Sequence, residues 1–206
     1  MSYLRPSLVL LVLFTALTGL VYPFAVTGIG QLVFPAQANG SLIVQDGRVV
    51  GSELIGQAFT SDRYLWPRPS ATSAADPADP SRTVDAPYNA AASTGSNLGP
   101  TSAKLADRLT ASSEAWQASG LAQPIPGDAV TTSASGLDPH ISPAFALAQA
   151  PRIAAARNLP EEQIRHVIET STEGRTFGIF GEPRVNVLLV NRALDRLSSQ
   201  GTRDVS

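Results

Sequence analysis

The chain of 206 residues is long enough for one domain with an appended segment, or for two small domains. Only 16% of its residues are charged and the formal net charge is −2, which excludes a basic nucleic-acid-binding module, because such a module needs clustered lysine and arginine. A hydrophobic fraction of 43% argues against wholesale disorder, and the lack of cysteine excludes disulfides and thiolate zinc sites.

The N-terminal segment is apolar and almost uncharged. Up to residue 45 its one charged side chain is Arg5. Twelve strongly apolar residues fall between Ser7 and Gly28, and a helix over this stretch would be about 33 Å long, enough to cross a bilayer core of about 30 Å. We therefore predict a transmembrane helix within residues 1–30, kinked or ended by Pro23.

Two interpretations of this segment compete. A cleaved signal peptide would use Ala36-Gln37-Ala38 as its cleavage site, but the apolar run is longer than a signal core of about 7–15 residues, which favours an uncleaved signal anchor. Arg5 precedes the helix and the next basic residue is Arg48, so the positive-inside rule predicts a cytoplasmic N-terminus. We expect a single-pass protein of the inner (plasma) membrane, with residues 31–200 forming an extracytoplasmic domain.

The first part of the expected external domain is rich in turn signals. Asp46-Gly47 separates the apolar runs 41–44 and 48–55, and this pattern predicts a β-hairpin. Residues 70–87 are rich in alanine, serine, aspartate and proline, which predicts an exposed loop. The prolines expected to block regular structure in this loop are Pro77, Pro80 and Pro87.

The remainder of the chain predicts helices. Residues 101–119 form one, ended by Gly120, and Ser142-Pro143 is typical of an N-cap followed by the first helical turn. The acids after Pro160 begin another helix, whose apolar stripe is Ile164, Val167 and Ile168. Residues 186–199 form the clearest amphipathic helix, and 201–206 are expected to fray. The fold class is therefore α+β, helix-rich, with a small sheet near the start of the domain.

Candidate catalytic and metal-binding groups are sparse. Asp138 and His140 lie near several serines and could form a Ser-His-Asp hydrolase site, but no nucleophile elbow accompanies them, so we favour hydrogen bonds to the backbone at a tight turn. Glu162, His166 and Glu169 fall on one helix face, where a surface row of ion pairs is a better interpretation than a metal site. We expect no catalytic and no metal-binding residues.

Two glycine-containing segments leave their roles open. Residues 95–100 resemble an anion-binding loop, but they lack the Gly-Lys-Ser/Thr ending of a P-loop, and a turn entering the next helix is favoured. Residues 175–184 hold Phe177, Ile179 and Phe180 among glycines. They form either an exposed apolar contact surface or a packed, glycine-hinged connection, and the sequence does not decide between them.

Four segments together resemble the signature motifs of one family. They are Tyr64–Thr72 (YLWPRPSAT), Tyr88–Pro100 (YNAAASTGSNLGP), Ser133–Pro143 (SASGLDPHISP) and Gly178–Leu188 (GIFGEPRVNVL). In their order along the chain and in their residues they are similar to the motifs of the C-subunit (KdpC) family of the bacterial Kdp potassium-transporting ATPase. The resemblance extends from about Arg5 to Leu197. The alanine- and proline-rich stretch between Thr72 and Tyr88 is longer than the family pattern, and we expect it only to lengthen a surface loop.

The resemblance implies an accessory, non-catalytic subunit of a high-affinity, ATP-driven potassium uptake pump. Its implied partners are a channel-like subunit that selects potassium, a P-type ATPase subunit that uses ATP and Mg²⁺, and a small hydrophobic subunit. The family implies a role in assembly, and a role as a catalytic chaperone that raises the ATP affinity of the ATPase subunit. The candidate nucleotide contacts that this second role implies are Ser133, Ser135, Gly136 and Asp138.

Membrane topology argues against direct nucleotide contact, because a loop outside the membrane cannot reach a cytoplasmic ATP site. The alternative is that the external domain caps the potassium entrance of the channel-like subunit. A membrane-anchored hydrolase using Asp138, His140 and a serine, and a lone envelope scaffold, remain as hypotheses of other classes. The family-signature and interface candidates are Trp66, Arg68, Pro69, Tyr88, Asn89, Ser96, Asn97, Gly99, Asp138, His140, Ser142, Gly181, Glu182, Arg184 and Asn186.

Overall fold

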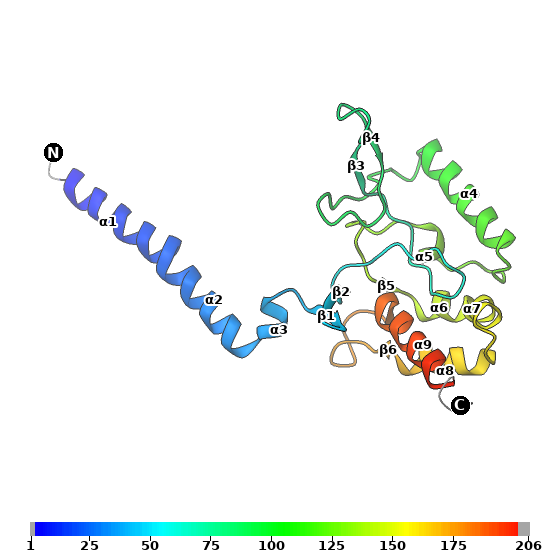
Figure 1. Ribbon diagram of the computed structural model, residues 1–206. Coiled ribbons are helices and arrows are strands. Elements are labelled where there is room, and N and C mark those ends of the chain that lie inside the picture. The colour runs from blue at the N-terminus through cyan, green and yellow to red at the C-terminus, as the bar shows by residue number, and fades with distance from the viewer. Residues whose placement is uncertain (1–2, 202–206) are drawn as a thin grey trace. The chain divides into compact units, whose positions relative to one another are not determined.

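The computed structural model describes residues 3–201, with side chains described up to residue 197, and divides the chain into two compact units that meet at Ser52 and Glu53 (Figure 1). Of the tail expected to fray, 201–206, only Gly201 falls among the described residues, as the last residue of a helix. Each unit is described by itself.

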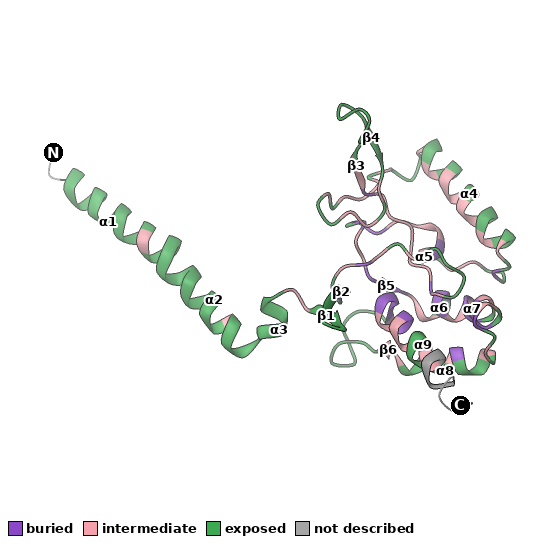
Figure 2. Ribbon diagram, in the orientation of Figure 1, coloured by how far each residue is buried: buried purple, intermediate pink, exposed green. Residues whose placement is uncertain are grey.

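The first unit is dominated by one continuous helical run, α1 (Leu4–Ala16), a π-helical turn η1 (Leu17–Val21) and α2 (Tyr22–Val33). None of its residues is buried, and the run is long and apolar enough to cross a membrane (Figure 2). Pro23, expected to kink or end the regular helix, does not end the helical run, but the regular α-helix is interrupted by the π-helical turn just before it. Proline lacks an N–H group and crowds the carbonyl four residues before it, and the wider π turn before Pro23 accommodates both effects.

A short helix and the predicted hairpin complete the first unit. After α3 (Pro35–Ala38), strands β1 (Leu42–Gln45) and β2 (Arg48–Ser52) pair antiparallel, which confirms the hairpin. Asp46 and Gly47 both have positive φ, 50° and 75°, as a two-residue turn with the twist of a hairpin requires.

The second unit begins with a long irregular segment. It is interrupted by β3 (Ser73–Ala75) and β4 (Thr83–Asp85), an antiparallel pair in which Ser73 faces Asp85. The expectation that 70–87 lacks regular structure is therefore wrong. The strands are only three residues long, and Pro77 and Pro80 lie in the tip between them, where no ladder hydrogen bond is lost.

Helices form most of the remainder of this unit (Figure 1). The predicted helices over 101–119, after Ser142, after Pro160 and over 186–199 are all confirmed, with small shifts of their ends. The observed elements are α4 (Ala103–Ala118), α5 (Gly127–Val130), α6 (Pro143–Ala148), α7 (Ala150–Arg157), α8 (Glu161–Thr170) and α9 (Val187–Gly201).

A three-stranded antiparallel sheet lies within the helical half, in the order β5-β7-β6. It joins β5 (His140–Ile141), β7 (Arg184–Asn186) and β6 (Thr172–Glu173), with Val185 paired to both Ile141 and Thr172. The small sheet expected near the start of the domain is the β1–β2 pair, and this three-stranded sheet in the second half is additional to it. The core around it contains Phe145, Ile153, Ile164, Ile168, Val185, Val190 and Leu194, all fully buried.

Candidate functional site

The first signature segment is held by two buried amide side chains. Asn191 on α9 accepts a hydrogen bond from the Leu65 N–H (2.7 Å) and donates one to the Leu65 carbonyl (3.0 Å). Gln149, between α6 and α7, makes the same pair of bonds with Trp66 (2.8 and 3.1 Å). A side chain on α9 and one at the α6–α7 junction thus satisfy backbone groups that a β-strand partner would satisfy in a sheet. We call these side chains the amide clamp.

Two arginines support the same segment. Arg157, whose side chain is fully buried, donates to the carbonyls of Arg63 (2.6 Å) and Leu194 (2.9 Å) and to the Asp195 carboxylate (2.8 Å). Arg152 lies over the Trp66 ring at 3.9 Å and donates to Gln149 Oε1 at 2.7 Å. A buried guanidinium is retained only where carboxylates and carbonyls accept its donors, so these contacts fix the segment in one conformation.

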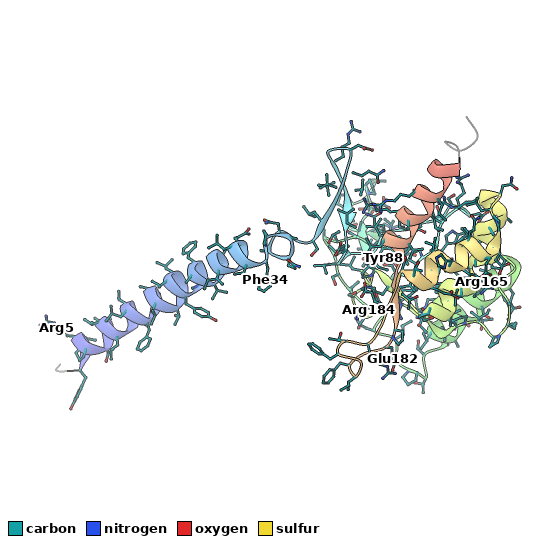
Figure 3. All side chains as sticks on the ribbon, turned by 90° about the horizontal axis from the view of Figure 1, so that it is seen from below. Arg5, Phe34, Tyr88, Arg165, Glu182 and Arg184 are labelled. Carbon is teal, nitrogen blue, oxygen red and sulfur yellow. The ribbon has the colours of Figure 1, made fainter. Side chains whose placement is uncertain are left out.

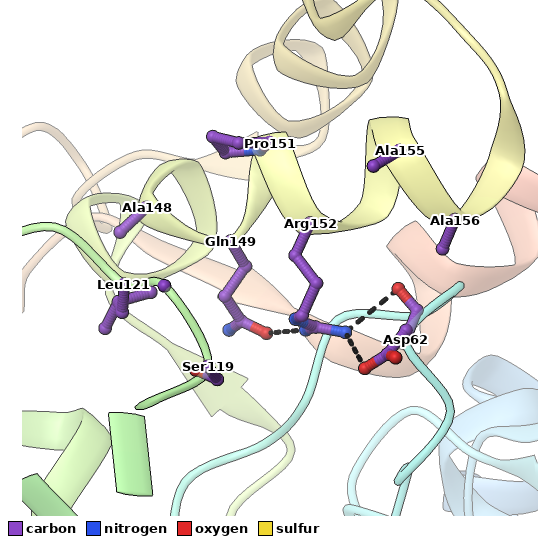
Figure 4. Close-up of a pocket in the computed structure, with 10 residues that line it drawn as sticks. Asp62, Ser119, Leu121, Ala148, Gln149, Pro151, Arg152, Ala155 and Ala156 are labelled. Atoms are coloured by element: carbon purple, nitrogen blue, oxygen red, sulfur yellow. Dashed lines mark hydrogen bonds and ion pairs between the residues drawn. The ribbon is translucent and has the colours of Figure 1, made fainter. Parts of the chain in front are cut away.

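Arg152 also borders the pocket drawn in Figure 4, a cavity of about 560 Å³ between the end of α4 and α7. An ion pair with Asp62 (3.5 Å) and the hydrogen bond to Gln149 engage its guanidinium, as the dashed lines show (Figure 4). The other lining groups are mostly small, among them Ser119, Ala148, Ala155 and Ala156. The pocket is therefore lined by the side chains that support Trp66, and the charge of Arg152 within it is neutralised by Asp62.

Farther along the segment, Arg68 joins it to the third signature segment. Its Nη1 lies 3.1 Å from Asp138 Oδ2, and its Nε donates to the Thr131 carbonyl at 3.3 Å. The second carboxylate oxygen of Asp138 accepts the His140 N–H at 3.0 Å. Burial alone would raise the pKa of Asp138, but the hydrogen bonds from His140 and the charge of Arg68 outweigh it and hold the pKa below its usual range. The Asp138 carboxylate is therefore a structural anion.

Tyr88 attaches the second signature segment to the same place. Its hydroxyl donates to the Arg68 carbonyl at 2.7 Å, and burial, with the charge of Asp138, raises the pKa of this phenol. A Cβ at Gly56 would collide with the Tyr88 ring and lie 2.8 Å from the Asp138 carbonyl oxygen, so glycine is required there. We call Arg68, Tyr88, Asp138 and His140 the polar junction, because it joins three of the four signature segments.

The candidate nucleotide segment 133–138 is packed into this framework. Ser133 and Gly136 are buried, the Gly136 carbonyl accepts the Ser70 hydroxyl at 2.7 Å, and the Ser135 carbonyl accepts the Thr94 N–H at 3.0 Å. Gly136 has φ of 67°, and a Cβ on it would lie 2.7 Å from the Thr94 carbonyl oxygen. These contacts fix the backbone of the segment against the first and second signature segments.

The serine-histidine-aspartate arrangement lacks its nucleophile among the described side chains. His140 Nδ1 lies 3.4 Å from Asp138 Oδ1, but no serine hydroxyl in residues 3–197 hydrogen-bonds to the imidazole. Ser142 instead donates to Asp128 Oδ1 (3.0 Å) and accepts the Phe145 N–H (3.1 Å), which confirms it as the N-cap of α6. The Asp138–His140 backbone turn expected from the sequence is present.

The candidate residues on α8, Glu162, His166 and Glu169, are all exposed. Within the described part of the chain, no three histidine or acidic side chains come together as possible ligands. His166 is exposed, and the ion pair on this helix is formed by Glu161 and Arg165, whose carboxylate oxygen and Nε lie 2.7 Å apart.

The fourth signature segment divides between an exposed loop and the sheet. Gly181 and Glu182 lie in the β6–β7 loop, and Glu182 pairs with Arg175 (2.6 Å), while Arg184 on β7 pairs with Glu173 (2.8 Å). Asn186 is buried, donates to the Glu53 carbonyl (2.9 Å) and accepts the Leu189 N–H (3.2 Å), which caps α9. The open question about 175–184 is answered for its tip: Phe177, Ile179 and Phe180 are exposed.

The remaining interface candidates lie on the loops around the polar junction. Pro69 borders an apolar groove with Trp66 and Tyr88, and Asn89 donates to the Ser73 carbonyl at the base of the β3–β4 hairpin (2.8 Å). The residues 95–100 run as an irregular segment to α4, with Ser96 half-buried and Asn97 and Gly99 exposed. A second, open depression of about 390 Å³ brings Arg68, Asp138, His140, Ser142, Glu182 and Arg184 to one surface.

Sequence reasoning missed the amide clamp and Arg157. A signal existed for Asn191, because it falls on the apolar stripe of its helix between Val190 and Leu194, where a polar side chain must find a buried partner. Gln149 follows the buried run Phe145-Ala146 in the same way.

Comparison with known proteins explains why the four segments occur together. The chain matches the family described as "KdpC: K+-transporting ATPase, c chain" over residues 4–196. Curated relatives named "Potassium-transporting ATPase KdpC subunit" include that of Methylobacterium nodulans, 58% identical over 97% of this chain and 100% of the relative. Those of Methylorubrum extorquens (59%; 97% and 100%) and Bradyrhizobium diazoefficiens (56%; 96% and 98%) are similar. The polar junction, its supports and the apolar N-terminal helix are therefore the framework of a KdpC chain, and this protein belongs to the KdpC family, the C subunits of potassium-transporting ATPases.

Proposed function

We propose that this subunit is non-catalytic, is anchored in the inner membrane by the helix Leu4–Val33, and is needed to assemble the pump. One observation carries the anchoring: the helix exposes its large apolar side chains along its whole length, and Arg5 is its one charged residue. Apolar surface of that extent is unfavourable in water and matches the thickness of a bilayer core.

The second unit lies outside the cytoplasm in this proposal. Arg5 at the cytoplasmic end of the helix supports this orientation through the positive-inside rule. The chain has no native cysteine, so single cysteines report topology cleanly. A membrane-impermeant maleimide added to spheroplasts should label Gln163→Cys on exposed α8 and spare Tyr3→Cys. The reverse pattern would overturn the orientation.

The proposed partners are a channel-like potassium-binding subunit, a P-type ATPase subunit that uses ATP and Mg²⁺, and a small hydrophobic subunit, with potassium as the transported ion. The names of the relatives, which describe a subunit of a potassium-transporting ATPase, support this assignment. Purification of the tagged chain in mild detergent from potassium-starved cells should recover these partners in stoichiometric amounts. Recovery of the chain alone would contradict the assembly role.

Two finer roles predict different kinetics. A catalytic chaperone would lower the KM of the ATPase subunit for ATP, whereas a cap over the potassium entrance would change the apparent affinity for potassium. The orientation proposed from Arg5 favours the cap, since a loop outside the membrane cannot reach a cytoplasmic ATP site. ATPase assays of the purified pump reassembled with and without the subunit, titrating ATP and potassium separately, distinguish the two.

A further inference from the structure

The β6–β7 loop, residues 174–183, presents an apolar tip to its surroundings. Phe177, Ile179 and Phe180 are 89%, 70% and 66% exposed. Figure 3 shows the loop projecting from the body of the second unit beside the labelled Glu182 and Arg184. Single exposed apolar residues are common, but three large ones gathered on one tight turn form a contact surface.

The loop is ordered by its own hydrogen bonds. Thr176 and Phe180 exchange two backbone hydrogen bonds (2.9 and 3.0 Å), Gly178 N–H donates to the Arg175 carbonyl (3.0 Å), and Ile179 N–H donates to the Thr176 carbonyl (3.2 Å). The N–H groups of Thr176, Gly178, Ile179 and Phe180 are therefore satisfied within the loop. This pairing lowers the cost of moving the loop into an apolar medium, which offers no replacement for water.

Charge is confined to the base of the loop and is neutralised there. The ion pairs Arg175–Glu182 and Arg184–Glu173 flank the tip, at 2.6 and 2.8 Å. The tip can therefore leave water without taking an unpaired charge with it, which would be the largest energetic obstacle to burial.

The backbone conformation of Phe177 is unfavourable for the isolated fold, which points to a contact outside it. Its φ of 55° lies in the left-handed region, which bulky side chains rarely adopt, and its ring has no packing in the fold to compensate. An asparagine would adopt this backbone more readily. The phenylalanine is thus unfavourable for the isolated fold, and an apolar medium outside the fold would favour it.

We propose that this loop inserts Phe177, Ile179 and Phe180 into the interfacial region of the lipid bilayer in which the chain's own helix is anchored. The inference rests on the membrane anchoring proposed above. The residues 34–52 alone connect the apolar helix to the second unit, and this short tether holds the loop at high effective concentration near the bilayer. The apolar tip is also small in comparison with a protein–protein interface, which buries about 800 Å² on each partner. Fluid lipid, in contrast, can adapt to a small protruding apolar surface.

The test uses the full chain reconstituted in phosphatidylcholine vesicles. The single cysteine of Ile179→Cys carries an environment-sensitive NBD label, and nitroxide-bearing phospholipids serve as the quencher. We expect this label to be blue-shifted and to lose most of its fluorescence, and the label at Gln163→Cys on exposed α8 to stay unquenched. Adding Phe177→Asn should abolish the quenching at position 179, while Val84→Asn on the exposed β4 strand should not change it.

An unquenched label at position 179 would overturn the lipid contact. If that label is then also shielded from aqueous iodide in the assembled pump, a partner protein is the occupant. A label at Leu13→Cys reports anchoring separately. If it escapes quenching, the membrane anchor of the proposed function fails, whereas the label at position 179 alone decides the loop contact.

Discussion

Residues 64–68 and residues 174–183 both lack the regular pairing of a helix or a long strand, yet they are held in opposite ways. The first segment has Leu65 fully buried and its backbone bonded by the side chains of Asn191 and Gln149. The second exposes its apolar tip and pairs its backbone with itself. The comparison teaches that irregular backbone can be ordered from outside or from within. Only the segment ordered from within can extend away from the core and keep its shape.

The largest effect should come from breaking the support of the first segment. Asn191→Leu keeps the number and branching of the side-chain heavy atoms but leaves the Leu65 N–H and carbonyl unpaired in the core. We expect the free energy of unfolding to fall by about 2–4 kcal/mol, since each buried unsatisfied group costs about 1–3 kcal/mol. Urea denaturation of the chain in detergent measures this. Gln163→Leu, an exposed helical control, should change stability little, and an equal loss in both variants would contradict the amide clamp.

The next largest effect should come from the packing of Tyr88 on Gly56. In Gly56→Ala the new methyl group would meet the Tyr88 ring and the Asp138 carbonyl oxygen. We expect a loss of about 1–3 kcal/mol from overpacking in the same denaturation assay. Gly99→Ala is the matched control, because nothing lies within 4 Å of a Cβ there. If Gly56→Ala is as stable as Gly99→Ala, the polar junction can shift to accommodate the methyl group without loss of stability, and the prediction is wrong.

A smaller, pH-dependent effect is expected at Asp138. Its pKa is held below that of the unfolded chain, so its ionised form stabilises the fold above about pH 4 and this contribution is lost as the pH falls through the lower folded value. Because both partners of the Arg68 pair are partly exposed, we expect Asp138→Asn to cost only about 1 kcal/mol at pH 7. Unfolding free energies of both chains should converge as the pH falls below about 4 and through the lower folded pKa of Asp138. A gap that stays constant as the pH falls below about 4 would assign the effect to packing.

The smallest effect on stability should come from the second segment. Phe177→Asn removes a side chain that is 89% exposed and relieves a left-handed aromatic residue, so the melting temperature should stay constant or rise slightly. The same variant should lose lipid contact at position 179. A marked fall in melting temperature would mean that the ring supports the fold, and the contrast between the two segments would disappear.

Patterns that are local in the sequence predicted their structures well. The uncharged run after Arg5 predicted the long apolar helix, Asp46-Gly47 predicted the hairpin, and the spacing of Val187, Val190 and Leu194 predicted the last amphipathic helix. Each rests on neighbours within a few turns, where residue type limits the choice of conformation.

The contacts between residues far apart in the chain could not be predicted from local sequence patterns. The bonds of Asn191 to Leu65 and of Arg68 to Asp138 join residues 126 and 70 positions apart, and no local pattern specifies such partners. The three-stranded sheet has strands of two or three residues, too short for an alternating pattern to show. The apolar tip of 174–183 was visible in the sequence, but its exposure follows only from the turn that Phe177, Gly178 and Gly181 make with positive φ.

The β3–β4 hairpin has a practical consequence for labelling the pump. Its base is closed where the Ala86 N–H donates to the Thr72 carbonyl (3.1 Å) and the Thr72 hydroxyl donates to the Ala86 carbonyl (2.6 Å), while its tip around Pro77 and Pro80 is exposed. A closed base isolates the framework from whatever length the tip has, because added residues extend outward from a fixed stem. An epitope or a small fluorescent domain inserted between Pro77 and Pro80 should therefore mark the assembled complex in living cells without loosening the fold.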